Sequence, residues 1–380
     1  MVYADLAARL GGAGGLPVEW RTVFEQVPRQ GFIPDLVWDD DRTPIRRGET
    51  PDRWRDLVEA DAPVITQLDD GIGAGRGYIS SSASKPSIVA MMLAALDLRG
   101  DHYVLEVGTG TGWNAALLAA RLGDDRVTTI EVDPVLADNA RRALAAAGYR
   151  PRVLTGDGMA GAGRFAPFDR VIATAAVRQV PYAWVEQTRP GGRVVTPWGT
   201  AFHNGTLLVL DVQGDGTAVG RFGGDIGFMW VRGQRTPHGS VEERVLPDHD
   251  CTEAVTGLHP YEPVGDFDAS FAVGLRVPGA VSTVVHDGDD PSVGRFTVYL
   301  MDPGSGSWAS WRITPSTVGE YRVRQHGPRR LFDEVADAYR WWEQVGRPEH
   351  SRFGVTVTPR ESRVWLDDPA RVVHTPKAAR

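Results

Sequence analysis

The sequence predicts an α/β protein in which a largely parallel sheet is preceded by a helical cap and followed by an α+β domain. Short apolar runs alternate with helical segments over residues 76–235, a pattern typical of parallel strands joined by helical crossovers. Beyond residue 240 the pattern changes to alternating polar and apolar residues with one clear helix. A chain of 380 residues is long enough for two domains. We therefore expect a cap over residues 1–75, a central domain over 76–235 and a C-terminal α+β domain over 240–380.

The central domain is expected to alternate strands with helices. The expected strands lie near residues 103–107, 127–132, 151–155, 168–173, 193–197 and 206–212. The expected helices cover residues 86–97, 113–122, 134–147 and 181–188. Such alternation favours a parallel sheet, because each helix carries the chain back to the start of the next strand.

The flanking regions are less regular. Pro17 predicts the start of a helix, and residues 39–56, which are rich in Asp, Arg and Pro, are expected to form an exposed loop. In the C-terminal domain, apolar residues recur on one face of an expected helix over 331–345. The strands expected there lie at 296–300, 321–325, 354–358 and 363–366.

The overall composition disfavours several classes of function. The net charge is −8 and the pI is about 5.6, whereas nucleic-acid binding requires a basic surface. The single cysteine, Cys251, cannot form an internal disulfide, which fits the reducing cytoplasm. The longest apolar stretch, 88–96, is too short to span a membrane, and no secretion signal is evident. The spacing of His, Cys and Asp predicts no metal site. We expect a cytoplasmic protein whose oligomeric state the sequence leaves open.

The stretch 104–112 reads Val-Leu-Glu-Val-Gly-Thr-Gly-Thr-Gly, and an alanine- and leucine-rich helix follows it. Glycines in such a turn let the backbone approach a ligand and expose N–H groups at the start of the helix. The spacing is G-x-G-x-G, and Trp113 stands where a dinucleotide fingerprint has its third glycine. This segment predicts a ligand-binding turn, and the residues that follow must identify the ligand.

Three further segments place polar groups near this turn. Glu131 closes the second expected strand, where a carboxylate can accept both ribose hydroxyls of a nucleoside; the alternative is an ordinary solvated acid. Asp157, followed by Gly158, can bind the amino group and ring nitrogens of adenine; the alternative is a simple turn. Ser84 precedes a helix that begins at Pro86, and its hydroxyl either caps that helix or orients a carboxylate at the reacting centre.

Taken in order, these segments resemble the protein-L-isoaspartate O-methyltransferase family over roughly residues 18–235. The motifs that carry the resemblance are Val27-Pro28-Arg29, Phe32-Ile33-Pro34, Ser84-x-Pro86, the glycine turn, Gly156-Asp157-Gly158, Phe168-Asp169, Thr174-Ala175-Ala176, Pro181 and Pro190-Gly191-Gly192-Arg193. The resemblance implies a Rossmann-like, S-adenosylmethionine-dependent methyltransferase domain. Members of the family methylate the carboxylate of isoaspartate, and the ester collapses to a succinimide.

The resemblance also implies roles for individual residues. Ser84 matches the serine that the family places at the acceptor carboxylate, and it is the expected catalytic residue; Ser81, Ser82 and Lys85 are expected to bind substrate beside it. The residues implied for the cofactor are Gly108, Thr109 and Gly110 at its methionine part, Glu131 and Val132 at its ribose, and Asp157 and Gly158 at its adenine.

Two features depart from the family pattern. The family has a single Ile-Ser-x-Pro, whereas this chain has Ile79-Ser-Ser-Ser-Ala-Ser-Lys-Pro86, so the substrate end of the site is expected to differ. The chain also continues for about 145 residues beyond the family's usual end. This tail resembles that of methyltransferases associated with ATP-grasp (graspetide) peptide maturation. The likeness implies methylation of an aspartate in a ring-constrained ribosomal peptide, followed by aspartimide or isoaspartate formation.

A carboxylate acceptor agrees with the residues present. An Asp side chain, with a pKa of about 3.9, is ionised at neutral pH, so methyl transfer needs no general base. No convincing base motif occurs, and His102 and His203 are expected at a loop or strand edge. Two alternatives remain open: repair of isoaspartyl residues, and a module that binds the cofactor or a partner enzyme without catalysis.

Overall fold

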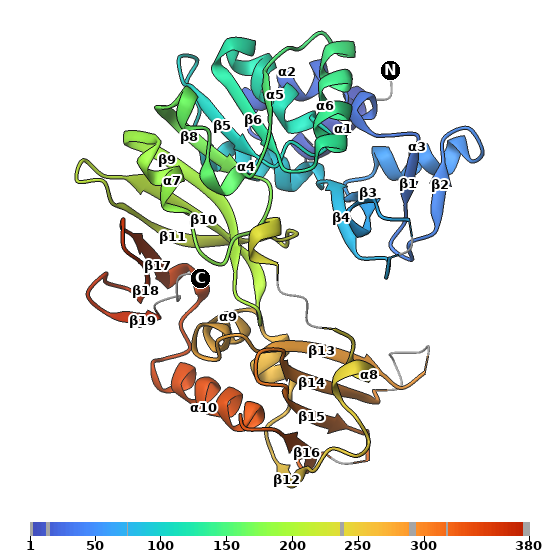
Figure 1. The fold of residues 1–380 in the computed structure, drawn as a ribbon, viewed down its shortest axis with the longest axis vertical. Coiled ribbons are helices and arrows are strands. Elements are labelled where there is room, and N and C mark those ends of the chain that lie inside the picture. Colours follow the sequence, from blue (N-terminus) through green and yellow to red (C-terminus); the bar gives the residue numbers. More distant parts are fainter. Residues whose placement is uncertain are drawn as a thin grey trace.

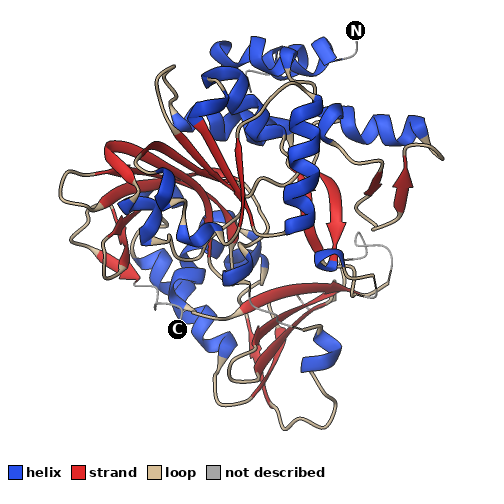
Figure 2. Ribbon diagram, turned by 45° about the horizontal axis from the view of Figure 1, so that its top comes forward, coloured by secondary structure: helices blue, strands red, loops and turns tan. Residues whose placement is uncertain are grey.

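The computed structural model describes residues 3–12, 16–73, 75–235, 239–288, 294–316 and 318–374. The described residues form a ten-stranded sheet, a four-stranded sheet near the N-terminus and a five-stranded sheet in the C-terminal part (Figure 1). Helices lie on both faces of the ten-stranded sheet, and the five-stranded sheet is separate from it (Figure 2). No helix in the described part of the chain is long and apolar enough to cross a membrane.

The ten-stranded sheet confirms the predicted parallel core. Its order is β19-β18-β17-β11-β10-β9-β8-β5-β6-β7, and the strands from β9 to β7 in this order are parallel. These five are β5 (Val104–Val107), β6 (Val127–Glu131), β7 (Arg152–Thr155), β8 (Phe168–Ala173) and β9 (Thr188–Gly199). The chain runs from β5 outward to β7 and then returns to β8 on the other side of β5. A crevice therefore forms at the carboxyl ends of β5 and β8, where open α/β sheets bind their ligands.

The helices of the central domain lie close to the expected positions. They are α4 (Pro86–Leu96), α5 (Trp113–Leu122), α6 (Pro134–Ala146) and α7 (Tyr182–Glu186). Helix α6 begins where the Asp133 carboxylate accepts the N–H groups of Val135 and Leu136. Helices α4 and α5 pack with α2 (Val18–Gln26) on one face of the sheet, and α7 packs on the other. Strand β9 begins earlier than expected because a register shift against β8 accommodates Pro-Gly-Gly at 190–192.

The N-terminal part is more than the expected helical cap. Besides α1 (Tyr3–Gly12), α2 and α3 (Pro51–Glu59), it holds a sheet of order β2-β1-β3-β4. The strands are β1 (Leu36–Trp38), β2 (Pro44–Arg46), β3 (Val64–Leu68) and β4 (Ile79–Ala83). The interpretation of residues 39–56 as a loop was therefore wrong in part, since β2 lies within this range and α3 begins within it. β1 and β2 have three residues each, too few for an alternating pattern.

The C-terminal part is divided between two sheets. β10 (Asn204–Val212) and β11 (Ala218–Asp225) extend the parallel core, and β17 (Phe353–Val357), β18 (Ser362–Leu366) and β19 (Val372–His374) continue it. Antiparallel pairing of β11 with β17 makes this junction, with Ala218 opposite Val357. The last strands of the expected 240–380 domain thus complete the central sheet.

The five-stranded sheet has the order β12-β16-β15-β14-β13 and is antiparallel throughout. Its strands are β12 (Thr252–Thr256), β13 (Val281–His286), β14 (Phe296–Asp302), β15 (Ser307–Ile313) and β16 (Tyr321–His326). Helices α9 (Phe267–Arg276) and α10 (Leu331–Gln344) share one continuous apolar core with this sheet and with the ten-stranded sheet. Helix α8 (Val241–Arg244) precedes β12 in the chain. The C-terminal part is therefore packed firmly onto the central domain.

Candidate active site

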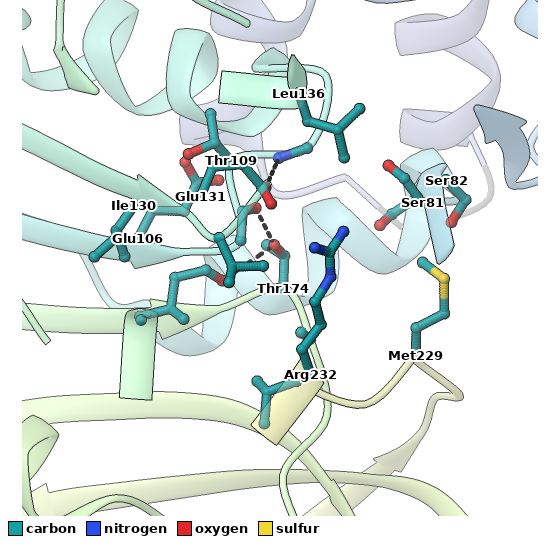
Figure 3. Close-up of a pocket in the computed structure, with 18 of the residues that line it drawn as sticks. Ser81, Ser82, Glu106, Thr109, Ile130, Glu131, Leu136, Thr174, Met229 and Arg232 are labelled. Carbon is teal, nitrogen blue, oxygen red and sulfur yellow. Dashed lines mark hydrogen bonds between the residues drawn. The ribbon is translucent and has the colours of Figure 1, made fainter. Parts of the chain in front are cut away.

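A cavity lies at the carboxyl ends of β5, β6 and β8, at the crevice that the strand order creates (Figure 3). Its other walls come from β4 and from the segment 229–235. In the close-up, Ser81 and Ser82 lie on the side opposite Glu131 and Thr109. Ten expected site residues line the cavity: Ser81, Ser82, Ser84, Gly108, Thr109, Gly110, Glu131, Val132, Asp157 and Gly158.

The glycine turn after β5 adopts a backbone that requires glycine. Gly108, Gly110 and Gly112 have φ values of 97°, 53° and 90°. A Cβ atom on Gly108 would lie 2.7 Å from the Thr174 hydroxyl, which donates to the carbonyl of Gly108. A Cβ atom on Gly158 would lie 2.5 Å from Val107 Cγ1. Only glycine therefore fits at Gly108 and Gly158, because a side chain would clash with Thr174 or Val107.

Glu131 is fixed at the end of β6. Its Oε2 accepts the N–H of Gly110 at 2.9 Å, and its Oε1 accepts the N–H of Asp133 at 3.1 Å. The side chain is only 7% exposed. Each carboxylate oxygen can still accept a second hydrogen bond. The carboxylate is therefore held rigidly where it can accept two ligand hydroxyls.

Asp157 has a local structural role as well as a place in the cavity wall. Its carboxylate accepts the N–H of Met159 at 2.9 Å and caps the short 3-10 helix Gly158–Ala160. The Asp157 side chain is exposed, and Val132, another residue of the cavity wall, is 38% exposed. The turn interpretation and the ligand interpretation are thus compatible at Asp157.

Glu106 is a site residue that the motif analysis missed. It lines the cavity, is fully buried, and accepts hydrogen bonds from Asn114 at 2.7 Å and Thr129 at 2.6 Å. Burial raises the pKa of Glu106 to about 7, against the lowering effect of these two hydrogen bonds. The signal in the sequence was an acid inside the apolar run Val-Leu-Glu-Val.

The serine-rich segment lines the substrate side of the cavity. Ser81 accepts a hydrogen bond from the Thr66 hydroxyl, whereas in the described structure neither the Ser82 nor the Ser84 hydroxyl has a partner within the protein. The interpretation of Ser84 as a helix cap was wrong, because α4 begins at Pro86 and Lys85 is its N-cap. Lys85 does not line the cavity, and its ammonium group lies 3.7 Å from Asp61. Lys85 is therefore not placed to contact substrate there.

Arg29 holds the backbone of this segment in place. It is 1% exposed, and its guanidinium donates to the carbonyls of Ala83 and Ser84 at 2.9 and 3.0 Å. It also donates to the carbonyls of Val58, Ala60 and Ala62. One buried side chain thus fixes the strand end that carries Ser84 to the loop that follows α3.

Two arginines from the segment 229–235 complete the cavity wall. Arg232 contacts Asp133 at 2.8 Å and Asp70 at 3.1 Å, and Arg235 binds both Asp70 oxygens at 2.9 Å. Burial acts to raise the pKa of Asp133, but hydrogen bonds from Arg232, Gln67 and the α6 backbone outweigh it and lower this pKa. These contacts join three segments that are distant in the sequence, so no local pattern indicated them.

The remaining chemistry-bearing groups lie elsewhere. Neither His102 nor His203 lines the cavity. His203 is buried against α9, where its Nδ1 lies 2.8 Å from the Ser270 hydroxyl. The described residues contain no cluster of three or more His, Cys, Asp or Glu side chains arranged to hold a metal ion. The polar groups of the cavity wall are therefore carboxylates, hydroxyls, backbone N–H groups, the Asn114 amide and the guanidinium groups of Arg232 and Arg235.

Comparison with known proteins agrees with this geometry. Residues 19–235 match the model of the family described as protein-L-isoaspartate(D-aspartate) O-methyltransferase (PCMT). The protein-L-isoaspartate O-methyltransferase of Methanopyrus kandleri is 38% identical over 212 residues, covering 55% of this chain and 81% of that protein. That of Pyrococcus abyssi is 34% identical over 217 residues, covering 57% of this chain and 95% of that protein.

A solved structure described as a protein-L-isoaspartate O-methyltransferase has a similar fold over nearly the whole chain. The match covers 96% of this chain and 99% of the other, with a TM-score of 0.54 and 20% sequence identity. At this identity the likeness concerns the fold alone. It includes the C-terminal part, so that part has a structural counterpart in the other chain.

Proposed function

We propose a function for this chain from the premise that it belongs to the protein-L-isoaspartate(D-aspartate) O-methyltransferase family. In the proposal, it esterifies the side-chain carboxylate of an aspartate in a ring-constrained, ribosomally made peptide in the cytoplasm. The chain is an S-adenosylmethionine-dependent carboxyl O-methyltransferase. In the proposal, the backbone amide nitrogen that follows the esterified aspartate attacks the ester and releases methanol. The product is an aspartimide, which hydrolysis opens to aspartate or isoaspartate.

The residues around the cavity fit S-adenosylmethionine. Gly108 and Gly110 line the cavity with backbone alone, and the fixed Glu131 carboxylate can accept the ribose hydroxyls. Asp157 and Gly158 also line the cavity, and in the proposal they hold the adenine. Glu106 adds an acid that a cationic ligand can ionise. When bound, the cofactor supplies an electrophilic methyl group carried by a sulfonium.

Methyl transfer to a carboxylate requires little from the protein except that it positions the acceptor. A peptide carboxylate oxygen forms a bond to the methyl carbon while the carbon–sulfur bond breaks and its electron pair stays on sulfur. The carboxylate is ionised at neutral pH, so no proton has to be removed. The Ser84 hydroxyl can donate a hydrogen bond to one carboxylate oxygen and leave the other to react. Residues of β4 and of the segment 229–235 form the cavity walls on the side proposed for the acceptor.

The observation that carries the proposed substrate is the serine-rich wall. Ser80, Ser81, Ser82 and Ser84 all line the cavity, so the acceptor meets several hydroxyls. The hydroxyls of Ser80 and Ser81 are engaged within the β3–β4 region, and those of Ser82 and Ser84 face substrate in our proposal. A ring-constrained peptide suits such a wall, because a fixed backbone can meet several fixed donors with little ordering cost.

Repair of isoaspartyl residues is the second candidate. The family match and the relatives from Methanopyrus kandleri and Pyrococcus abyssi favour it. Because the fold match described above includes the C-terminal part, the presence of that part does not separate the two substrates. Only a direct comparison of the two kinds of substrate can distinguish peptide modification from isoaspartyl repair.

The test is intact-mass analysis with three peptides and S-adenosylmethionine. We would use an aspartyl peptide closed by a side-chain lactam, the same peptide in linear form, and a linear isoaspartyl peptide. The proposal expects a gain of one methyl group and then net loss of water on the ring-closed peptide alone. Methylation of the isoaspartyl peptide alone would establish repair. If none reacts, calorimetry with S-adenosylhomocysteine would show whether the chain binds cofactor, and binding without turnover would favour a non-catalytic module.

A further inference from the structure

The cavity at the carboxyl ends of β5, β6 and β8 is called the cofactor cavity below. A second, separate cavity lies where the C-terminal part meets the central sheet. Its walls come from the loop after β8, the turn between β9 and β10, the end of α9 and the end of β19. It holds about 600 Å³, enough for a side chain and a short stretch of peptide. Gly274 brings α9 close to the turn, because a Cβ atom there would lie 2.3 Å from the Thr200 hydroxyl. We call it the arginine cavity, after Arg178 and Arg276 in its wall.

The charges in the wall favour an anion. The lining residues include the Arg178 and Arg276 guanidinium groups and the His374 imidazole, and none of the described lining residues is Asp or Glu. Burial lowers the pKa of His374, so at neutral pH the positive charge belongs to the two arginines. Burial also lowers the pKa of Arg178, which nonetheless stays charged because an arginine titrates far above neutral pH.

Both guanidinium groups are stacked on tryptophans. Arg178 lies 4.7 Å from the centre of the Trp230 ring, and Arg276 lies 4.6 Å from that of Trp341. Stacking occupies the face of a guanidinium and leaves the N–H donors in its plane, which for Arg276 are offered to a ligand. Arg178 has a further interaction within the protein, so its contribution to binding is its positive charge. The stacking restricts the side chains and lowers the entropic cost of binding a carboxylate.

The arginine cavity is close to the cofactor cavity. Ala175 lines the cofactor cavity, and Arg178, three residues later, lines the arginine cavity. Three residues of extended chain span at most about 11 Å. Trp230, on which Arg178 stacks, also lines the cofactor cavity. An extended peptide advances about 3.3 Å per residue, so a few residues can cross from one cavity to the other.

We propose that the arginine cavity binds an acidic side chain of the peptide substrate, Asp or Glu, located a few residues from the acceptor. This inference rests on the proposed function, since it assumes a peptide acceptor in the cofactor cavity. It gives the C-terminal part a direct role in substrate choice, because α9 and β19 supply Arg276 and His374. The preferred substrate is then a peptide with at least two acidic residues, one methylated and one used for recognition.

Point variants test this better than truncation, because β17–β19 belong to the ten-stranded sheet and deleting residues 240–380 would expose β11. The probes are fluorescent lactam-closed aspartyl and linear isoaspartyl peptides, each with Glu or Gln placed three or four residues on either side of the acceptor. Binding is measured by fluorescence anisotropy with S-adenosylhomocysteine present, and kcat/KM is measured by methyl transfer. The anisotropy readout does not depend on turnover, so it judges this inference even if the proposed function fails.

We expect at least one Glu peptide to bind about fivefold or more tightly than its Gln partner at low salt, and the difference to shrink as salt rises. Arg276→Gln and Arg178→Gln should each remove most of that preference and leave the Gln peptides unaffected. Arg47→Gln is the matched control, because Arg47 lies 4.9 Å over Trp54 and is remote from the arginine cavity. Equal binding of Glu and Gln peptides at every position, or a Glu preference that survives in both variants, would overturn the inference. Arg276 is exposed at the end of its helix, so its variant is expected to fold.

Discussion

The N–H of Gly110 donates to Oε2 of Glu131 at 2.9 Å, and this bond joins the glycine turn after β5 to the end of β6. The other oxygen, Oε1, accepts the N–H of Asp133 at the start of α6. One carboxylate therefore sets the relative position of three segments of the cofactor cavity. Glu131 therefore shapes the glycine turn, and in our proposal it also offers acceptors to the ribose of the cofactor.

Glu131→Ala should weaken cofactor binding by at least about tenfold, because both the ribose acceptors and the support of the turn are lost. Isothermal titration with S-adenosylhomocysteine measures this directly. Glu186→Ala is the control, since Glu186 is exposed on α7 and does not line the cavity. An unchanged Kd in Glu131→Ala would remove Glu131 from the ribose site.

Cofactor affinity should depend on pH through Glu106. Burial raises the pKa of Glu106 to about 7, above the value of 4.5 for an unperturbed side chain. The folded protein without ligand therefore binds more protons at Glu106 than the unfolded chain does, and this contribution to stability falls as pH rises from 4.5 through 7. A cationic ligand favours the ionised carboxylate, so its affinity should rise over the same range.

We therefore expect the Kd for S-adenosylmethionine to tighten between pH 6 and pH 8, and Glu106→Gln to remove most of this dependence. Titration calorimetry at several pH values, in buffers of different ionisation enthalpy, also counts the protons released on binding. A wild-type Kd that stays flat across this range would show that Glu106 does not sense the ligand charge.

The sequence predicted those helices and strands that interactions between neighbouring residues determine. The strands and helices of residues 86–173 appear close to their expected positions, because buried runs, prolines at helix starts and a glycine turn all act within a few residues. The residues predicted for the cofactor line one cavity for the same reason. β17 was expected as a strand, but its partner β11 lies more than a hundred residues earlier, and nothing local specifies that pairing. Asp70, Asp133 and Arg232 likewise meet only in three dimensions.

Arg29→Lys should destabilise the fold and slow catalysis together. The buried guanidinium bonds five carbonyls, and a lysine ammonium has three donors, so at least two carbonyls would lose this partner. We expect a loss of roughly 2–4 kcal/mol in the free energy of unfolding, measured by urea denaturation. Arg21→Lys, an exposed position on α2, is the control. Wild-type stability in Arg29→Lys would show that these contacts are replaceable.

Ser84→Ala should slow methyl transfer without weakening cofactor binding. Ser84 lines the substrate side of the cavity, its hydroxyl does not cap α4, and Arg29 fixes its backbone through the Ser84 carbonyl. Loss of one hydrogen bond to the acceptor carboxylate is expected to reduce kcat by roughly tenfold or more, because the carboxylate is then less well oriented. Single-turnover methylation of a saturating peptide, with a parallel titration of S-adenosylhomocysteine, separates the two effects. Ser87→Ala is the matched control, because Ser87 lies in the first turn of α4 and outside the cavity. If Ser84→Ala retains the rate of Ser87→Ala, the orienting hydroxyl must belong to another residue, and Ser82→Ala would be the variant to compare next.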